Sequence, residues 1–203
     1  MRKTICVLGV AGVVLATAAA SFAQQPPTVR VRGTIEAVDG AVLSIKARDG
    51  SDLKFKMTDN LNVVAVVKAS LDDIKPGSFV GSTAMPEEDG HWKAVEVHIF
   101  PEAMRGTGEG DRPYDFKPKS TMTNGTVGDG FAKVEGSVMT LKYKEGEKKI
   151  DITPATVIVT YAPGNKDELK PGAKIYIPAA TKQDDGTLTS PRINVGRYIA
   201  PPM

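Results

Sequence analysis

Histidine and cysteine, the side chains that most often bind metals or act as catalytic bases, are rare in this chain. Its 203 residues include two histidines, His91 and His98, and one cysteine, Cys6. We place His91 in a turn and His98 on the outward side of a strand beside Glu96, where solvent would cover them. Glu96 and His98 are a weaker alternative as a metal site, because structural zinc sites need about four ligands. We therefore expect no bound cofactor.

Covalent catalysis has equally little support in the sequence. A hydrolytic triad needs a nucleophile, a base and an orienting acid, and no serine stands in a nucleophile-elbow pattern. The acidic pair Asp72 and Asp73 is placed at the start of a helix, where it favours the helix dipole. The acidic run 87–89 is placed in a hairpin turn, where solvated acids are common. The sequence favours a protein that is not an enzyme, with an enzyme of unrecognised type as the alternative.

The densest mixture of charged, aromatic and glycine residues lies in the segment 102–123. A flexible spacer would consist of glycine and serine, so this composition predicts a structured linker. The simpler interpretation is that its ion pairs pack two domains together, and the alternative is a site for a ligand or partner. In either case we expect an arginine in a buried or bidentate ion pair that attaches the linker to a domain. Five residues are the candidate binding residues: Arg105, Glu109, Asp111, Arg112 and Tyr114.

The segments on either side of this linker repeat one another in order and spacing. Gly33-Thr34-Ile35 corresponds to Gly125-Thr126-Val127, and the stretch 72–77 corresponds to 167–172. Each copy is long enough for a small domain with a modest core. The sequence therefore predicts two tandem domains that occupy residues 28–101 and 124–199.

Each copy has the pattern of five short strands and one short helix. In the first copy Leu43 and Ile45 alternate with polar residues, as expected of a strand with one buried face. Ser70, followed three residues later by Asp73, predicts the start of a helix, which the Pro-Gly pair 76–77 ends. The second copy repeats this capping pattern at Asn165 and Glu168.

Three strands, a short helix and two strands is the order of the five-stranded OB barrel. The predicted fold class is therefore all-β, with two tandem OB-like barrels and one short helix between strands three and four of each. A small barrel of the SH3-like kind is the rival architecture. We expect the two barrels to superpose, with Ile74 and Leu169 in equivalent helical positions.

The last strand of each copy predicts a β-bulge. Its inward residues are spaced by two, three and two positions in both copies, so one residue is extra at the same place. These residues are Trp92, Ala94, Val97 and Ile99 in the first copy, and Leu188, Ser190, Ile193 and Val195 in the second.

Residues 1–23 have the pattern of a secretory signal peptide. Two basic residues precede an apolar run that ends near Ala20, and small residues follow, which predicts cleavage before Gln24. Cleavage after Ala20 and an uncleaved membrane anchor are the alternatives. We expect export to the periplasm, no membrane span after cleavage, and no disulfide, because Cys6 is lost with the signal peptide.

The charge balance narrows the class of partner. Removing the two basic residues of the signal peptide from the total of 26 leaves 24 basic side chains against 24 acidic ones. This balance excludes a strongly basic nucleic-acid binder. With 41% hydrophobic and 25% charged residues, the composition is that of a folded globular protein. We expect no nucleic acid as a partner, but an unknown protein or small ligand of the cell envelope.

The linker region resembles that of uncharacterised secreted proteins of Gram-negative bacteria, which carry tandem OB-like domains of unknown function. The resemblance rests on Ile99-Phe100-Pro101-Glu102, the stretch 105–110, Arg112-Pro113 and the stretch 120–124, and it extends to the ending 195–203. Where this family shows His-Arg-Pro-Trp in the linker, this chain has Asp111-Arg112-Pro113-Tyr114. Some members are labelled as metal-transporter permeases, a label at odds with a mature chain that has no segment long enough to span a bilayer.

The resemblance implies a fold and a compartment but no activity. We interpret the protein as a non-catalytic periplasmic binding or accessory module. The alternatives are a weak metal- or cation-binding envelope protein and an enzyme of unrecognised type.

Overall fold

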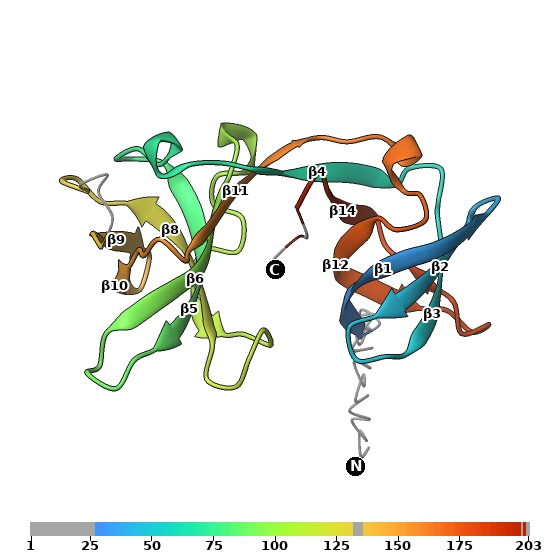
Figure 1. Cartoon of the computed structure of the whole chain (residues 1–203), viewed down its shortest axis with the longest axis horizontal. Coiled ribbons are helices and arrows are strands. Elements are labelled where there is room, and N and C mark those ends of the chain that lie inside the picture. The colour runs from blue at the N-terminus through green and yellow to red at the C-terminus, as the bar shows by residue number, and fades with distance from the viewer. Residues whose placement is uncertain (1–26, 132–135, 200, 202–203) are drawn as a thin grey trace, which may run out of the picture.

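The computed structural model describes residues 27–131, 136–199 and 201, and their regular structure is almost entirely β (Figure 1). The predicted signal peptide lies outside the described residues. The strands are β1 Thr28–Asp39, β2 Val42–Ala47, β3 Asp52–Lys56, β4 Asn62–Lys68, β5 Phe79–Pro86, β6 Trp92–Ile99, β7 Gly110–Pro113, β8 Thr121–Val127, β9 Val138–Tyr143, β10 Gly146–Asp151, β11 Val157–Pro163, β12 Lys174–Lys182, β13 Leu188–Thr189 and β14 Arg192–Gly196. Three short 3-10 turns complete the described elements: η1 Leu71–Asp73, η2 Glu102–Met104 and η3 Lys166–Glu168. Within the described residues, no helix has the length and apolarity needed to cross a membrane.

Five strands close into a first barrel, which lies at the right of Figure 1. The pairings run in the order β1, β2, β3, β13, β12 and back to β1. All are antiparallel except the pairing of β3 with β13, where Phe55 lies opposite Leu188. The alternation that predicted a strand at Leu43 and Ile45 is confirmed, because both side chains are buried inside this barrel.

A second barrel has the same order of pairings. It runs through β8, β9, β10, β6, β5 and back to β8. Its parallel pairing joins β10 to β6, with Asp151 opposite Lys93. Val97, Met139 and Ile150 fill its interior. The prediction of an all-β fold with a closed five-stranded barrel is therefore confirmed.

The barrels are not built from consecutive strands, as two tandem domains would be. The first barrel takes β1–β3 from the predicted domain 28–101 and β12–β13 from the predicted domain 124–199. The second barrel takes β8–β10 from 124–199 and β5–β6 from 28–101. Hydrophobic alternation identifies a strand but not its partner, and two similar copies offer equivalent partners. The sequence pattern could not choose between consecutive and exchanged pairing.

The strands β4 and β11 carry the chain between the barrels (Figure 1). They pair antiparallel with each other, with Ala65 opposite Ala162. Beyond this crossing, β4 lies parallel to β14 and β11 lies parallel to β6. The paired strands β12, β14, β4, β11 and β6 thus form a continuous hydrogen-bonded connection between the two barrels.

The predicted short helices are single 3-10 turns. The β-branched run 63–67 forms a separate strand, β4, so η1 lies between β4 and β5, and η3 lies between β11 and β12. The capping pattern is present, because the backbone N–H of Ser70 donates to Asp73 Oδ2 at 2.8 Å. The residues that follow the turns, Ile74 and Leu169, are not helical, but each is buried in a barrel core.

The predicted bulge is present in the last strand of the first copy. Thr83 pairs with Glu96 and Ala84 pairs with Ala94, so Val95 is the extra residue. In the second copy the strand is divided into β13 and β14 at Ser190-Pro191, and the Pro191 carbonyl accepts from Asn62 N–H.

Gly125 in β8 allows a close approach to the neighbouring strand. A Cβ at this position would lie 2.6 Å from the Lys142 carbonyl oxygen, whereas one at Gly128 would meet nothing closer than 3.5 Å. We expect Gly125→Ala to lower the free energy of unfolding by about 1–3 kcal/mol, because the strands must move apart. Gly128→Ala should change it by less than about 0.5 kcal/mol. Urea unfolding measures both, and equal effects would contradict the close approach.

Candidate functional site

The outward faces of the two barrels meet in a shared hydrophobic cluster, the junction core. Its side chains come from both barrels, from the crossing strands and from the linker. The buried members are Val66, Phe79, Phe100, Tyr114, Met122, Val159, Tyr161 and Tyr176. Residues on the outer face of a barrel strand are therefore not solvated where they point towards this cluster.

Glu96 and His98, which we expected to be solvated, are buried beside the junction core. Their side chains are 1% and 2% exposed, and His98 Nδ1 lies 3.2 Å from Glu96 Oε1. The His98 ring packs edge-on against Phe100, with centroids 4.7 Å apart. The predicted outward direction is right, but the solvation is wrong, because rings of the junction core pack on this face of β6.

This pair is part of a group of buried polar side chains. Glu96 Oε2, Thr83 Oγ1 and Asn124 Oδ1 are buried and have no hydrogen-bond partner among the described residues. Gly81 leaves the room for this group, because a Cβ there would overlap the His98 ring and Asn124 Oδ1. No cluster of three or more His, Cys, Asp or Glu side chains suited to a metal ion occurs in residues 27–131 and 136–199.

Two of the candidate linker residues, Arg105 and Glu109, lie away from the junction core. Arg105 is exposed and makes a two-bond ion pair with Glu102 of the same segment, while its Nη2 donates to the Gly77 carbonyl at 3.0 Å. Glu109 is exposed in the turn before β7. The expected bidentate arginine pair is therefore present, but it is local and solvated.

Asp111 supplies the buried attachment of the linker, and its partner is a lysine. Lys148 Nζ of β10 lies 3.0 Å from Asp111 Oδ1 and donates to Thr121 Oγ1 at 2.7 Å. The Lys148 side chain is 7% exposed and stacks on the Trp92 ring, 3.4 Å from its centroid. Burial lowers the pKa of Lys148, and the hydrogen bond to Asp111 partly restores it. Lys148 was not predicted from the sequence, since a lysine on a strand is ordinarily solvated.

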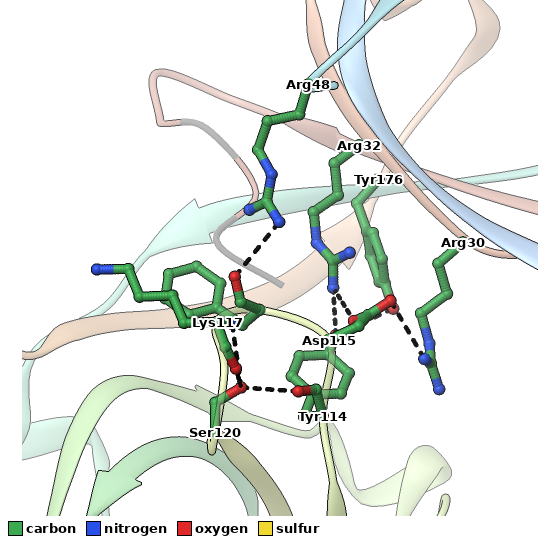
Figure 2. Close-up of polar contacts among 9 residues, drawn as sticks. Arg30, Arg32, Arg48, Tyr114, Asp115, Lys117, Ser120 and Tyr176 are labelled. Carbon is green, nitrogen blue, oxygen red and sulfur yellow. Dashed lines mark hydrogen bonds and ion pairs between the residues drawn. The ribbon is translucent and has the colours of Figure 1, made fainter. Parts of the chain in front are cut away.

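The segment after β7 docks on the first barrel (Figure 2). Arg32 Nη2 donates to the Tyr114 hydroxyl at 3.0 Å and to Asp115 Oδ1 at 2.8 Å. Arg30 lies 3.3 Å from the other carboxylate oxygen of Asp115. Two arginines of β1 thus share one linker carboxylate, and the Tyr114 hydroxyl meets that of Tyr176 at 3.2 Å.

The electrostatics of this contact follow from its partial burial. Burial opposes ionisation of Asp115, but the hydrogen bond from Arg32 and the charges of Arg32 and Arg30 outweigh it and lower the pKa of Asp115. Burial raises the pKa of Tyr114 and that of Tyr161. Both phenols therefore stay neutral at physiological pH.

A pocket of about 210 Å³ opens above the junction core. Of the candidate linker residues, Arg112 and Tyr114 line this pocket. The buried side-chain amides of Asn124 and Asn194 also line it. Its full lining is Arg30, Phe100, Thr107, Arg112, Tyr114, Met122, Asn124, Tyr161, Tyr176, Pro178, Arg192 and Asn194. These residues come from the linker, from strands of both barrels and from β11 and β14, so the pocket depends on how the two barrels are joined.

The pocket residues Arg192 and Asn194, which come from the second copy, were not predicted from the sequence. Arg192 lies over the Tyr161 ring, 5.1 Å from its centroid, and its Nε donates to Asn194 Oδ1 at 2.8 Å. Arg192 and Asn194 are two residues apart on β14, so alternation gives them a common face. The polar character of that face was the available signal, but it is equally typical of a solvated strand.

Comparisons with family models, with curated proteins and with solved structures gave no significant match to this chain.

Proposed function

We propose that the chain is a non-catalytic binding module of the periplasm that holds a small ligand in the pocket between its two barrels. The observation that carries this proposal is the pocket, in which aromatic rings, arginines and buried amides from both barrels converge. Ligand sites combine mainly apolar and aromatic walls with a few placed polar groups.

The arrangement of strands supports the comparison with OB barrels. Each copy supplies five barrel strands in chain order, which are β1, β2, β3, β5 and β6 in the first copy and β8, β9, β10, β12 and β13 in the second. Both circuits join strands one, two and three of one copy to strands five and four of the other, with strands three and five parallel. The matching circuits and capping turns also favour two copies of one unit that exchanged their last strands. OB barrels commonly bind ligands on an outer barrel face, although fold alone does not assign a function. The periplasmic location rests on the signal-peptide pattern of residues 1–23.

The ligand is small. At about 210 Å³ the pocket is below the ~300–1,000 Å³ of sites for drug-sized molecules. Asn124 lines the pocket and its Nδ2 donates to the Thr107 carbonyl at 2.9 Å, whereas its Oδ1 faces Gly81 and His98.

Thr107 allows the pocket to be blocked from its rim. Its side chain is exposed and lines the pocket, so Thr107→Trp should fill the opening without disturbing a core. Ala103→Trp is the matched control, because Ala103 is exposed on the same linker and does not line the pocket. A library of fragment-sized compounds is screened by thermal unfolding against the natural protein and both variants.

We expect at least one compound to raise the melting temperature of the natural protein and of Ala103→Trp, but not that of Thr107→Trp. A compound at 100 times its Kd stabilises the folded state by about 2.7 kcal/mol. If no compound stabilises the protein, or if all stabilise Thr107→Trp equally, the pocket is not a ligand site.

A further inference from the structure

The charges around the pocket are unbalanced. Three arginines line it, Arg30, Arg112 and Arg192, and no carboxylate of the described residues does. Arg30 pairs with Asp115 at 3.3 Å. Neither Arg112 nor Arg192 forms an ion pair with a carboxylate of the described residues.

Both of these arginines are held in place by neutral groups. Arg112 Nη1 donates to the Gly108 carbonyl at 2.6 Å, and Arg192 Nε donates to Asn194 Oδ1 at 2.8 Å. A guanidinium has five N–H donors, so each keeps donors for a ligand. Both are partly buried, which strengthens their attraction for an anion relative to a fully solvated arginine.

The other walls of the pocket are apolar or aromatic and favour an apolar part of a ligand. Phe100, Met122 and the rings of Tyr114, Tyr161 and Tyr176 form them. The nearest buried carboxylate, that of Glu96, is bonded to His98 beneath the junction core and does not line the pocket. An aromatic or other ring on the ligand could stack on the tyrosines while its charged group met the arginines.

From this geometry we infer that the ligand is a small organic anion, with a carboxylate or phosphate group bound by Arg112 and Arg192 and a ring-shaped or apolar body packed on the tyrosines. This inference rests on the proposed function and narrows it to one chemical class. Planar guanidinium groups bind carboxylates and phosphates through paired, charge-assisted hydrogen bonds.

The test compares benzoate, phenyl phosphate, benzyl alcohol and inorganic phosphate by calorimetric titration of the full chain. We expect benzoate or phenyl phosphate to bind at least about tenfold more tightly than both benzyl alcohol and inorganic phosphate. Preference for benzoate identifies a carboxylate as the natural group, and preference for phenyl phosphate identifies a phosphate. Binding of inorganic phosphate as tight as that of phenyl phosphate would contradict the role of the apolar body.

Substitution of the arginines tests which of them bind the charged group of the ligand. Arg112→Met and Arg192→Met should each weaken binding of the preferred anion about tenfold or more. Arg105→Met, which removes an exposed arginine outside the pocket, should leave it unchanged. Circular dichroism verifies folding, and Arg112→Met keeps the test valid if loss of the Arg192 stack on Tyr161 destabilises the chain.

The outcomes separate the two proposals. If benzyl alcohol binds as tightly as benzoate and the arginine variants bind normally, the anion inference is wrong while the pocket remains a ligand site. If none of the four probes binds, the anion inference is also wrong. The proposed function itself fails only if the fragment screen finds no compound whose stabilisation Thr107→Trp abolishes.

Discussion

The variant His98→Leu is expected to lose about 3–5 kcal/mol of unfolding free energy. It leaves the carboxylate of Glu96, which is 1% exposed, without its partner beside the junction core. Removing one partner of a buried polar pair is strongly destabilising, because the group left behind is neither hydrated nor hydrogen-bonded. Urea unfolding followed by circular dichroism gives the difference directly.

Two controls separate the loss of the contact between Glu96 and His98 from the loss of packing. The double variant Glu96→Met/His98→Leu should recover most of the stability, because apolar replacement of a whole buried pair is often neutral. His91→Leu should cost less than about 1 kcal/mol, since the His91 side chain is 64% exposed and its contact with Asp151 is solvated. A loss at His98 as small as that at His91 would show that the pair is not buried as described.

We expect Asp111→Ala to be the second most damaging change, at about 3 kcal/mol. It leaves the buried ammonium group of Lys148 without a carboxylate and removes the side-chain contact between β7 and β10. Glu102→Ala, which breaks the exposed pair with Arg105, should leave the free energy of unfolding almost unchanged. Limited proteolysis should also cut the linker faster in Asp111→Ala. Equal stability of the two variants would contradict the attachment.

The pH dependence of this loss has a defined sign. Burial already lowers the pKa of Lys148 in the folded protein, and removing Asp111 lowers it further. Between that lowered pKa and the ~10.4 of an unfolded lysine, the unfolded state binds more protons, so the stability of Asp111→Ala rises with pH. The difference from the natural protein should therefore shrink as pH rises through this window.

Local features of the fold could be predicted because they depend on neighbouring residues. Alternation placed Leu43 and Ile45 inside a strand, and the spacing of Ser70 and Asp73 predicted the capping contact. The two-three-two spacing placed the bulge between Ala94 and Val97. Each of these follows from a period or a spacing within a few residues.

Features that depend on distant segments could not be predicted. The exchange of strands between the copies is invisible in either copy, and it is this exchange that covers Glu96 and His98. Arg192 and Asn194 reach the pocket only because β14 lies beside β4 at the junction. The linker residues Arg112 and Tyr114 were found because their composition is unusual for a connecting segment.

The central claim, that the space between the barrels is a ligand site, is tested most directly by NMR titration of the isotope-labelled protein with benzoate and phenyl phosphate. We predict that the largest saturable shift changes occur at Tyr161, Arg192 and Asn194, and that Thr107→Trp abolishes them. Saturable changes confined to other surfaces, or changes at the junction that persist in Thr107→Trp, would contradict the claim.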